Sequence, residues 1–461
     1  MINLAPVDQY IILAYFLFTL WLGFGRKNQS ESTENFLVAG RRVTLPAFVA
    51  SLVSTWYGGI LGVGEFTYRF GISNWLVFGV PYYVCAILFA LFLAGVARRT
   101  EHYTIPDQLE KVYGSKARTA GALFIFLLAL PAPYLLMLGI LLHLILPIPT
   151  WTGILFAAGF SLLYIFRGGL QAVIRTDLLQ FVLMFLGFII LVGTAWTQYG
   201  GFSFLQQKLP AQHLTWHGGN SLQYILVWYV IAMATLVDAN FYQRCFAAKS
   251  EKVARRGILV SVLFWLVFDF LTTTAGLYAR VLLPELPDPA QSFPRLAVFL
   301  LPGIFQGIFF VALLATIMST LDSFGFVSAL TIGRDFLWRL RGGDDASLNF
   351  YTRIGLLFTF SISVVIAITS SSIISIWYQL GSIATPALLL PLLTSFSRRW
   401  KMSPTAAFVN IIAAGGISAL WIVVSLVSNQ MPFGVDAVFP GVLLSGIIYL
   451  IDAWFIKKDF S

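Results

Sequence analysis

The chain is poor in the residues that build disulfide frameworks and metal centres, with two cysteines and four histidines in 461 residues. Cys85 lies within one expected membrane span and Cys245 at the inner end of another, so a disulfide between them would have to form across the bilayer or in a reducing compartment. No HExxH pattern occurs, and the histidines are scattered near loops or span ends, at His102, His143, His213 and His217. We therefore predict no disulfide, no cofactor and no enzyme activity.

Charged residues are also scarce, at 11% of the chain, whereas 58% of the residues are hydrophobic and the mean hydropathy is +0.84. Soluble domains carry roughly a quarter charged residues, so this composition predicts an all-α, polytopic membrane protein. We treat residues 1–461 as a single transmembrane domain. Its thirteen expected spans lie at about 7–25, 45–68, 74–96, 119–145, 150–168, 176–197, 221–241, 257–279, 303–332, 352–371, 374–396, 405–428 and 435–456.

The few charges are distributed unevenly around these spans. The net charge is +9, and with the N-terminus outside, 25 of the 29 Lys and Arg residues face the cytoplasm. The four on the outer side are Arg69, Lys208, Arg280 and Arg295. This bias predicts a multi-pass protein of the cell (cytoplasmic) membrane with its N-terminus outside and its C-terminus inside. The basic charge then indicates contact with anionic membrane lipid and not with nucleic acid.

Hydroxyl groups occur in the middle of the apolar run 303–332. Thr316, Ser319, Thr320 and Ser323 lie there, and Thr316 precedes Ser319 and Thr320 by one helical turn. A polar group at that depth must find a partner, because lipid offers none. One interpretation is helix packing through small residues and bonds to backbone carbonyls. The other is a site for a hard cation such as Na⁺, which prefers oxygen ligands.

Glycine interrupts two of the expected spans, at residues 54–59 in the second and at residues 380–386 in the eleventh. A helix that unwinds in the membrane frees carbonyls that must line a cavity or coordinate something. In the second span, small residues could instead permit close helix approach. Segments 45–197 and 221–396 each contain five spans, so they are expected to form two inverted repeats, with one extra helix at 7–25 and two at 405–456.

Several motifs, taken in order, resemble the sodium:solute symporter family over nearly the whole chain. They are Asn35-Phe-Leu-Val-Ala-Gly-Arg41, Thr104-Ile-Pro-Asp-Gln-Leu-Glu110 with Tyr113-Gly114, residues 164–180, residues 241–249 and Ala315-Thr-Ile-Met-Ser-Thr-Leu-Asp-Ser323. The resemblance implies the inverted-repeat fold of the bacterial leucine transporter, with one helix before the ten-helix core. It also implies that a Na⁺ gradient drives uptake of a small organic solute.

The resemblance further implies which residues bind the ion. Hydroxyls of Ser319 and Thr320 and the carbonyl of Thr316, all on the ninth span, would meet the carbonyls of Ser54 and Tyr57 at the break in the second span. Asp177 corresponds to an acidic position that the family places near the inner sodium exit route, and the alternative is a hydrogen bond that supports the fold. Arg175 stands where relatives often carry an aromatic residue.

Two further acids are candidates for a proton or polar site. Asp269 lies near the middle of the eighth span, where an acid is costly and often functional, or it bonds to Thr272 or Thr273 one turn away. Glu65 lies nearer a span end, where we favour a structural role. These acids leave open a proton-coupled symporter of the same fold, and a membrane solute sensor is the other alternative.

The expected solute cavity is lined by aromatic and polar residues from three spans: Trp56, Tyr57, Trp228, Thr235, Trp377, Tyr378 and Gln379. Its rings could bind a quaternary amine by cation–π contact, stack on a sugar or form an apolar gate. Ile231 and Ala234 replace polar side chains of sugar-transporting relatives, which counts against a sugar. Amino acid, carboxylate and choline-like solutes remain open, and we predict no obligate protein partner.

Overall fold

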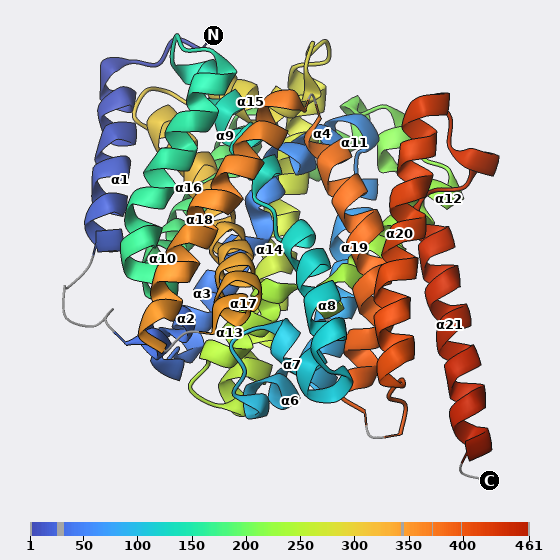
Figure 1. The fold of residues 1–461 in the computed structure, drawn as a ribbon. Coiled ribbons are helices and arrows are strands. Elements are labelled where there is room, and N and C mark those ends of the chain that lie inside the picture. Colours follow the sequence, from blue (N-terminus) through green and yellow to red (C-terminus); the bar gives the residue numbers. More distant parts are fainter. Residues whose placement is uncertain (1, 25–31, 343–344, 371, 398, 460–461) are drawn as a thin grey trace.

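The protein folds into a bundle of membrane-length helices (Figure 1). The computed structural model describes residues 2–24, 32–342, 345–370, 372–397 and 399–459. Within those ranges the regular structure is helical, and the β-structure consists of one bridge between Val43 and Ala248. Arg26, Lys27 and Arg398, which belong to the predicted cytoplasmic charge bias, lie outside the described residues.

The first half of the chain forms the following helices: α1 (Pro6–Phe24), α2 (Thr33–Val38), α3 (Leu45–Trp56), α4 (Ile60–Phe70), α5 (Val80–Leu88), α6 (Ala94–Thr100), α7 (Ile105–Tyr113), α8 (Ser115–Leu128), α9 (Ala132–Ile145), α10 (Thr150–Tyr199) and α11 (Phe202–Lys208). The second half forms α12 (Leu222–Ala232), α13 (Ala239–Ala247), α14 (Glu251–Leu282), α15 (Ser292–Leu300), α16 (Phe305–Leu330), α17 (Arg339–Arg341), α18 (Asp345–Thr369), α19 (Ile373–Ser395), α20 (Pro404–Ser428) and α21 (Val438–Asp459). Short 3-10 or π segments adjoin them: η1 (Ala39–Arg41), η2 (Tyr57–Gly59), η3 (Trp75–Gly79), η4 (Phe89–Leu93), η5 (Ala211–Leu214), η6 (Met233–Val237), η7 (Pro289–Gln291), η8 (Thr331–Trp338) and η9 (Pro432–Gly434).

Eleven helical segments of the described chain are long and apolar enough to cross a membrane, which confirms an all-helical, multi-span protein. One of them, α10, contains the predicted spans 150–168 and 176–197, because two helices meet there at a kink where Gly169 has φ 55°. The apolar part of α21, Val438–Trp454, is shorter than the others. The count of thirteen spans therefore stays a prediction.

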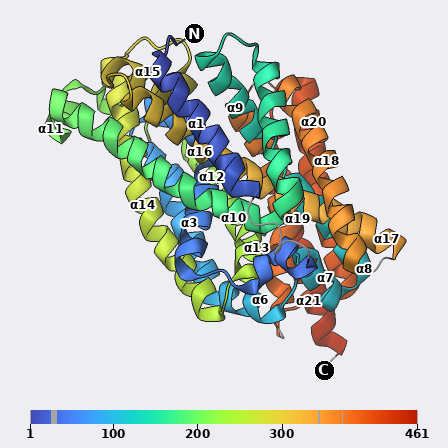
Figure 2. The same cartoon turned by 90° about the vertical axis from the view of Figure 1, so that its left-hand side faces the viewer.

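Helix α16 occupies the centre of the bundle. It packs against α1, α3, α9, α10 and α18, and almost all of its residues are buried. Its sequence is apolar around the whole circumference, as expected for a helix without a lipid-facing side. Figure 2 shows α1 lying along α10 and α16, where Phe16 packs edge-on against Phe156 and Phe160. The hydroxyl groups of α16 are thus held inside the protein and away from lipid.

The helix break predicted at residues 54–59 is present. The α-helical bonding of α3 ends at Trp56, and η2 separates it from α4. The glycines there also permit close approach: a Cβ on Gly58 would lie 2.2 Å from the Cβ of Thr320, and one on Gly59 would lie 2.3 Å from the ring of Trp377. The two interpretations of this glycine run are therefore compatible.

The break predicted at residues 380–386 was wrong, and a break elsewhere was missed. Helix α19 continues through Pro386 and Pro391, as membrane helices can when neighbouring groups satisfy the freed carbonyls. The missed break lies between α12 and α13, where the 3-10 turn η6 is followed by Asp238 in an extended conformation. No glycine or proline marks that position, so a local search for helix breakers could not find it.

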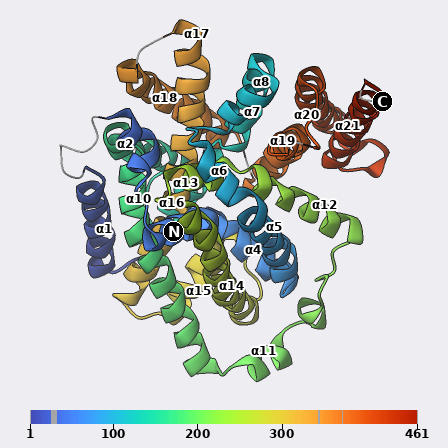
Figure 3. The ribbon, with the colours of Figure 1, turned by 90° about the horizontal axis from the view of Figure 1, so that it is seen from below.

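The two ends of the chain lie at opposite edges of the bundle. Helix α1 stands at one edge, whereas α19, α20 and α21 gather at the other (Figures 1 and 3). Helix α1 begins at the upper end of the bundle in Figure 1, and α21 ends at the lower end.

Candidate ion and solute site

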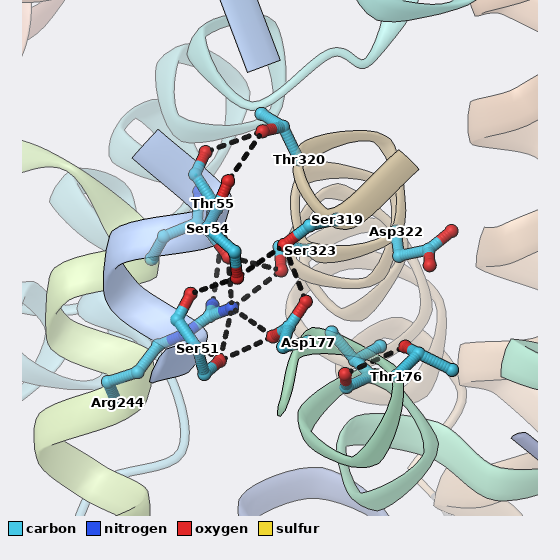
Figure 4. Close-up of polar contacts among 12 residues, drawn as sticks. Ser51, Ser54, Thr55, Thr176, Asp177, Arg244, Ser319, Thr320, Asp322 and Ser323 are labelled. Carbon is cyan, nitrogen blue, oxygen red and sulfur yellow. Dashed lines mark hydrogen bonds and ion pairs between the residues drawn. The ribbon is translucent and has the colours of Figure 1, made fainter. Parts of the chain in front are cut away.

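The hydroxyls of α16 face the end of α3. The Oγ1 of Thr320 donates a hydrogen bond to the carbonyl of Thr55 at 2.7 Å and lies 3.5 Å from the carbonyl of Ser54. The Oγ of Ser319 lies 2.8 Å from the Oγ of Ser54 (Figure 4). All of these groups are buried. The structure thus brings hydroxyls of α16 against oxygens of α3, next to the turn η2.

The other two predicted sodium ligands flank this contact. The Thr316 hydroxyl donates to the carbonyl of Ala312 at 2.7 Å, and the Thr316 carbonyl lies 3.4 Å from the Oγ1 of Thr320. Tyr57 is the first residue of η2, and its phenol donates to the carbonyl of Trp265 at 2.9 Å. The five residues therefore gather around one helix break, and their role as ion ligands stays a prediction.

Asp177 adjoins the same hydroxyl groups. Its two carboxylate oxygens accept hydrogen bonds from Ser319 at 2.6 Å and from Ser51 at 2.5 Å, and the side chain is fully buried. Arg175 contacts Gln171 instead, at 3.5 Å. Asp177 therefore makes the hydrogen bonds of a structural residue next to Ser319, and its place on a sodium exit route stays a prediction. This geometry is compatible with both interpretations of Asp177, the sodium exit route and the hydrogen bond that supports the fold.

Sequence reasoning missed the side chain that faces Asp177. Arg244 of α13 is fully buried and lies 3.6 Å from that carboxylate. Its Nη2 donates to Thr55 at 2.9 Å and to Ser323 at 2.5 Å, so it bridges α13, α3 and α16 (Figure 4). The available signal was an arginine within the motif at residues 241–249, close to a span that otherwise has little charge.

Asp322 is a second buried acid that sequence reasoning did not single out. It projects from α16 away from Ser319 (Figure 4) and accepts a hydrogen bond from the hydroxyl of Tyr164. Its other oxygen has no hydrogen-bond partner in the described part of the chain. An acid inside an apolar span was a usable signal.

A cavity of about 200 Å³ opens beside the two helix breaks. Five of the seven predicted solute-cavity residues line it: Trp56, Tyr57, Trp228, Thr235 and Trp377. Tyr378 and Gln379 are not among its described lining residues, and their prediction is corrected. The Tyr378 hydroxyl donates to Asp436 at 2.7 Å, and Gln379 contacts Ser375. Because α19 is unbroken, successive side chains point in different directions, and Trp377 alone of the three reaches the cavity.

The candidate acids Asp269 and Glu65 differ in surroundings. Asp269 borders the cavity and accepts a hydrogen bond from the Tyr83 hydroxyl. Thr272 bonds to the backbone carbonyl of Asp269 and Thr273 bonds to Asn74, so the expected side-chain bonds to Asp269 are not formed. Glu65 pairs with Arg69 at 3.1 Å. Asp269 is therefore the acid of the two that faces the cavity.

Comparison with known proteins agrees with this arrangement. Residues 36–413 match the model of the sodium:solute symporter family. The chain belongs to the sodium:solute symporter family. This member is 25% identical to sodium/proline symporter 2 of Staphylococcus saprophyticus, over 99% of this chain and 94% of that protein. It is 27% identical to the sodium/glucose cotransporter of Vibrio parahaemolyticus, over 66% of this chain but 63% of that protein.

Solved structures show the same fold. A Na⁺-coupled sialic acid symporter, solved in a substrate-bound outward-open state, superposes with a TM-score of 0.81 at 17% identity and covers 97% of both chains. MhsT in complex with L-phenylalanine superposes with a TM-score of 0.58 at 14% identity and covers 88% of this chain and 98% of that one. At these identities the likeness shows the fold and leaves the solute open.

Proposed function

We propose that this member of the family is a sodium-coupled symporter that moves a small organic solute by alternating access. One observation carries the proposal: Ser319 and Thr320 of α16 meet Ser54 and Thr55 of α3 at a helix break that also borders the cavity. An ion at that contact would lie beside the solute, so the occupancy of one site affects the other. The family membership supports the same activity.

The proposed ion ligands are Ser54, Tyr57, Thr316, Ser319 and Thr320. They offer hydroxyl and carbonyl oxygens, which suit Na⁺, and an ion among them would join α3 to α16. Without the ion, the two helices are joined by the hydrogen bonds of Ser319 and Thr320 and by Arg244, which bonds to Thr55 and Ser323. Each positive charge moved inward gains about 2.3 kcal/mol per 100 mV, which supplies the drive.

Asp177 is the proposed first stop on the inner exit route. It lies 2.6 Å from Ser319, and Arg244 lies on its other side, 3.6 Å away. The guanidinium partly compensates the carboxylate, so an ion that reaches Asp177 would be held loosely enough to leave.

The test is a double variant, Ser319→Ala with Thr320→Ala, assayed for Na⁺-dependent solute uptake in proteoliposomes. We expect the apparent Na⁺ affinity to fall about tenfold or more. The reason is that each lost oxygen ligand should cost about as much binding free energy as one hydrogen bond. The matched control is Ser328→Ala with Thr331→Ala, which removes two hydroxyls farther along the same continuous helical segment, the second of them bonded to the carbonyl of Val327. An unchanged Na⁺ affinity in the Ser319–Thr320 variant would overturn the placement of the ion.

Proton coupling is the second candidate, because the acid Asp269 borders the cavity. Glu65 is a weaker carrier, since Arg69 pairs with it. Uptake is measured under a Na⁺ gradient alone and under a pH gradient alone. Sodium coupling predicts uptake only in the first case, and strong uptake in the second would replace Na⁺ with H⁺.

We also propose thirteen spans with inverted repeats at 45–197 and 221–396, one extra helix before them at 7–25 and two after them at 405–456. The break between α3 and α4 lies in the first span of the first repeat, and the break between α12 and α13 lies in the first span of the second. Paired breaks of this kind support an inverted repeat. An outside N-terminus and an inside C-terminus agree with chain ends at opposite ends of the bundle, and accessibility labelling of a cysteine placed at each terminus would test it.

A further inference from the structure

The cavity beside the helix breaks is bordered by two carboxyl groups and by no basic side chain among its described lining residues. Asp238 follows the turn η6, and Asp269 lies in the middle of α14. Neither forms an ion pair with a described Lys or Arg. A carboxylate in a site of low dielectric is costly unless a cation pairs with it. Two carboxyl groups alone do not define a binding site. Three further features of this cavity indicate the same kind of solute.

Asp238 already occupies the helix start that would attract an anion. Its Oδ1 accepts hydrogen bonds from the backbone N–H groups of Asn240 at 2.7 Å and Phe241 at 3.4 Å, so it caps α13. The exposed N–H groups at a helix start otherwise form a binding site for carboxylate or phosphate. In this chain that position is filled by a negative side chain, which disfavours an anionic solute.

Aromatic rings make up much of the remaining wall. The eight that line the cavity are Trp56, Tyr57, Phe78, Tyr82, Tyr134, Trp228, Phe324 and Trp377. They pack against one another, with ring centroids 5.3 Å apart for Trp56 and Tyr82 and 4.6 Å apart for Phe78 and Trp228. Ring faces attract cations, and a desolvated cation–π contact contributes about 2 kcal/mol.

Two buried polar groups of the wall lack a partner. The indole N–H of Trp228 and the hydroxyl of Thr235 have no hydrogen-bond partner in the described part of the chain, although the two residues are only 2% and 1% exposed. A buried polar group without a partner is unfavourable, and an indole N–H can only donate. An acceptor oxygen on the solute would satisfy both groups.

We propose that the cavity binds a small organic cation, an ammonium or quaternary amine that also carries an oxygen acceptor. The rings of the cavity surround its charged head, Asp238 and Asp269 compensate the charge, and Trp228 with Thr235 binds the oxygen. The volume of about 200 Å³ is below the range of roughly 300–1,000 Å³ for drug-sized ligands, so the solute is a small metabolite. The assignment rests on the proposed function, because it names the solute of that symporter.

The experiment uses the purified full-length protein and three probes of closely similar shape. They are choline, the carbon isostere of choline that has a carbon atom in place of the nitrogen, and glycine betaine, which keeps the quaternary head but adds a carboxylate. Binding is measured by titration calorimetry and by thermal shift, in Na⁺ and in K⁺. We expect choline to bind in Na⁺ at least about tenfold more tightly than either of the other two. An isostere or a betaine that binds as tightly as choline overturns the inference without any variant.

Three variants then test the carboxyl groups. Asp238→Asn and Asp269→Asn remove one charge each, and the first keeps the cap because Asn caps helices as well as Asp. The matched control is Asp288→Asn. Asp288 caps η7 by accepting a hydrogen bond from the N–H of Ala290 at 3.1 Å, and it is not among the described residues that line the cavity. We expect choline affinity to fall about tenfold in each cavity variant and to stay unchanged in the control. Unchanged affinity in both cavity variants overturns the inference.

The outcomes also separate this inference from the proposed function. If Na⁺ drives uptake of neutral or anionic solutes and choline does not bind at millimolar concentration, the solute class is wrong and the symport stands. If choline binds equally in Na⁺ and in K⁺, and no Na⁺ gradient drives its uptake, the solute class stands and the sodium coupling is wrong.

Discussion

The acids of α7 and η8, which the proposed topology places at the inner end of the bundle, and the acids around the cavity differ in their partners. At the inner end, Asp107 of α7 lies 2.6 Å from the guanidinium of Arg334 and 3.3 Å from that of Arg339, and Asp335 lies 2.9 Å from Arg334. Around the cavity, Asp238 and Asp269 have hydrogen bonds but no ion pair within the described residues. Asp107 and Asp335 thus have arginine nitrogens within ion-pair distance, whereas the two cavity acids do not.

Buried carboxyl groups thus have two different roles in this protein. The inner cluster, which we define as Asp107, Glu110, Arg334, Asp335 and Arg339, joins α7 to η8 and α17, and each of its acids lies within 3.1 Å of an arginine nitrogen. Under the proposal above, the cavity acids gain a countercharge when the solute enters. Breaking a pair should therefore affect stability in the first region, whereas removing a charge should affect binding in the second.

The largest expected effect comes from breaking the inner cluster. Arg334→Gln leaves Asp107 and Asp335 without their closest cation, and loss of one partner of a buried pair costs about 3–5 kcal/mol. We expect a clearly lower free energy of unfolding, measured by denaturation in detergent. The exposed pair of Arg99 and Glu251 is the control, since Arg99→Gln should change stability by less than about 1 kcal/mol. Equal effects of the two variants would contradict the comparison.

Gly58→Ala is expected to act next most strongly, through packing at the ion contact. Its new Cβ would lie 2.2 Å from the side chain of Thr320, so α3 and α16 must separate. Overpacking of this kind costs about 1–3 kcal/mol. The apparent Na⁺ affinity should fall with the stability, measured by uptake and by thermal unfolding. Gly416→Ala, where no atom lies within 4 Å of the new Cβ, is the control that should change neither.

Asp269→Asn should have a smaller effect on stability, in contrast to Arg334→Gln. The amide oxygen still accepts the hydrogen bond of Tyr83, and no cation is left unpaired. We expect the free energy of unfolding without solute to change by less than about 1 kcal/mol, in either direction. A loss as large as that of Arg334→Gln would show that Asp269 is a structural acid, like those of the inner cluster.

The smallest expected effect is a pH dependence of the inner cluster. Burial is the largest single influence on Asp107 and opposes its ionisation, but the guanidinium of Arg334, the backbone N–H of Tyr103 and His102 together outweigh burial and hold the pKa of that carboxyl below its ordinary value. A lowered pKa adds stability that is fully present above the unfolded value of about 3.9 and is lost as the pH falls through the folded value. The stability difference between the wild type and Asp107→Asn should therefore stay constant from pH 7 to pH 5 and shrink at lower pH. A difference that shrinks between pH 7 and pH 5 would contradict the assignment.

Much of the fold was accessible from the sequence, because it depends on local properties. Apolar runs reveal membrane-length helices, and the glycines at residues 58 and 59 reveal the break after α3. The break before Asp238 was harder to find, since no glycine or proline marks it and the only local signal is Asp238 as a helix N-cap. The predicted break in α19 is wrong for the converse reason. Pro386 is visible in the sequence, but the neighbouring groups that let the helix continue are not.

The sequence by itself determined the family, the helical membrane class and the hydroxyls of Thr316, Ser319 and Thr320 on α16. Only the tertiary structure decided what those hydroxyls face. Asp177, Arg244 and Ser54 come from α10, α13 and α3, and their contacts with α16 depend on the angles and distances at which those helices pack. Hydropathy records how often a residue is buried, but it carries no information on which buried groups meet, so the cavity and its unpaired acids emerge only when the helices are assembled.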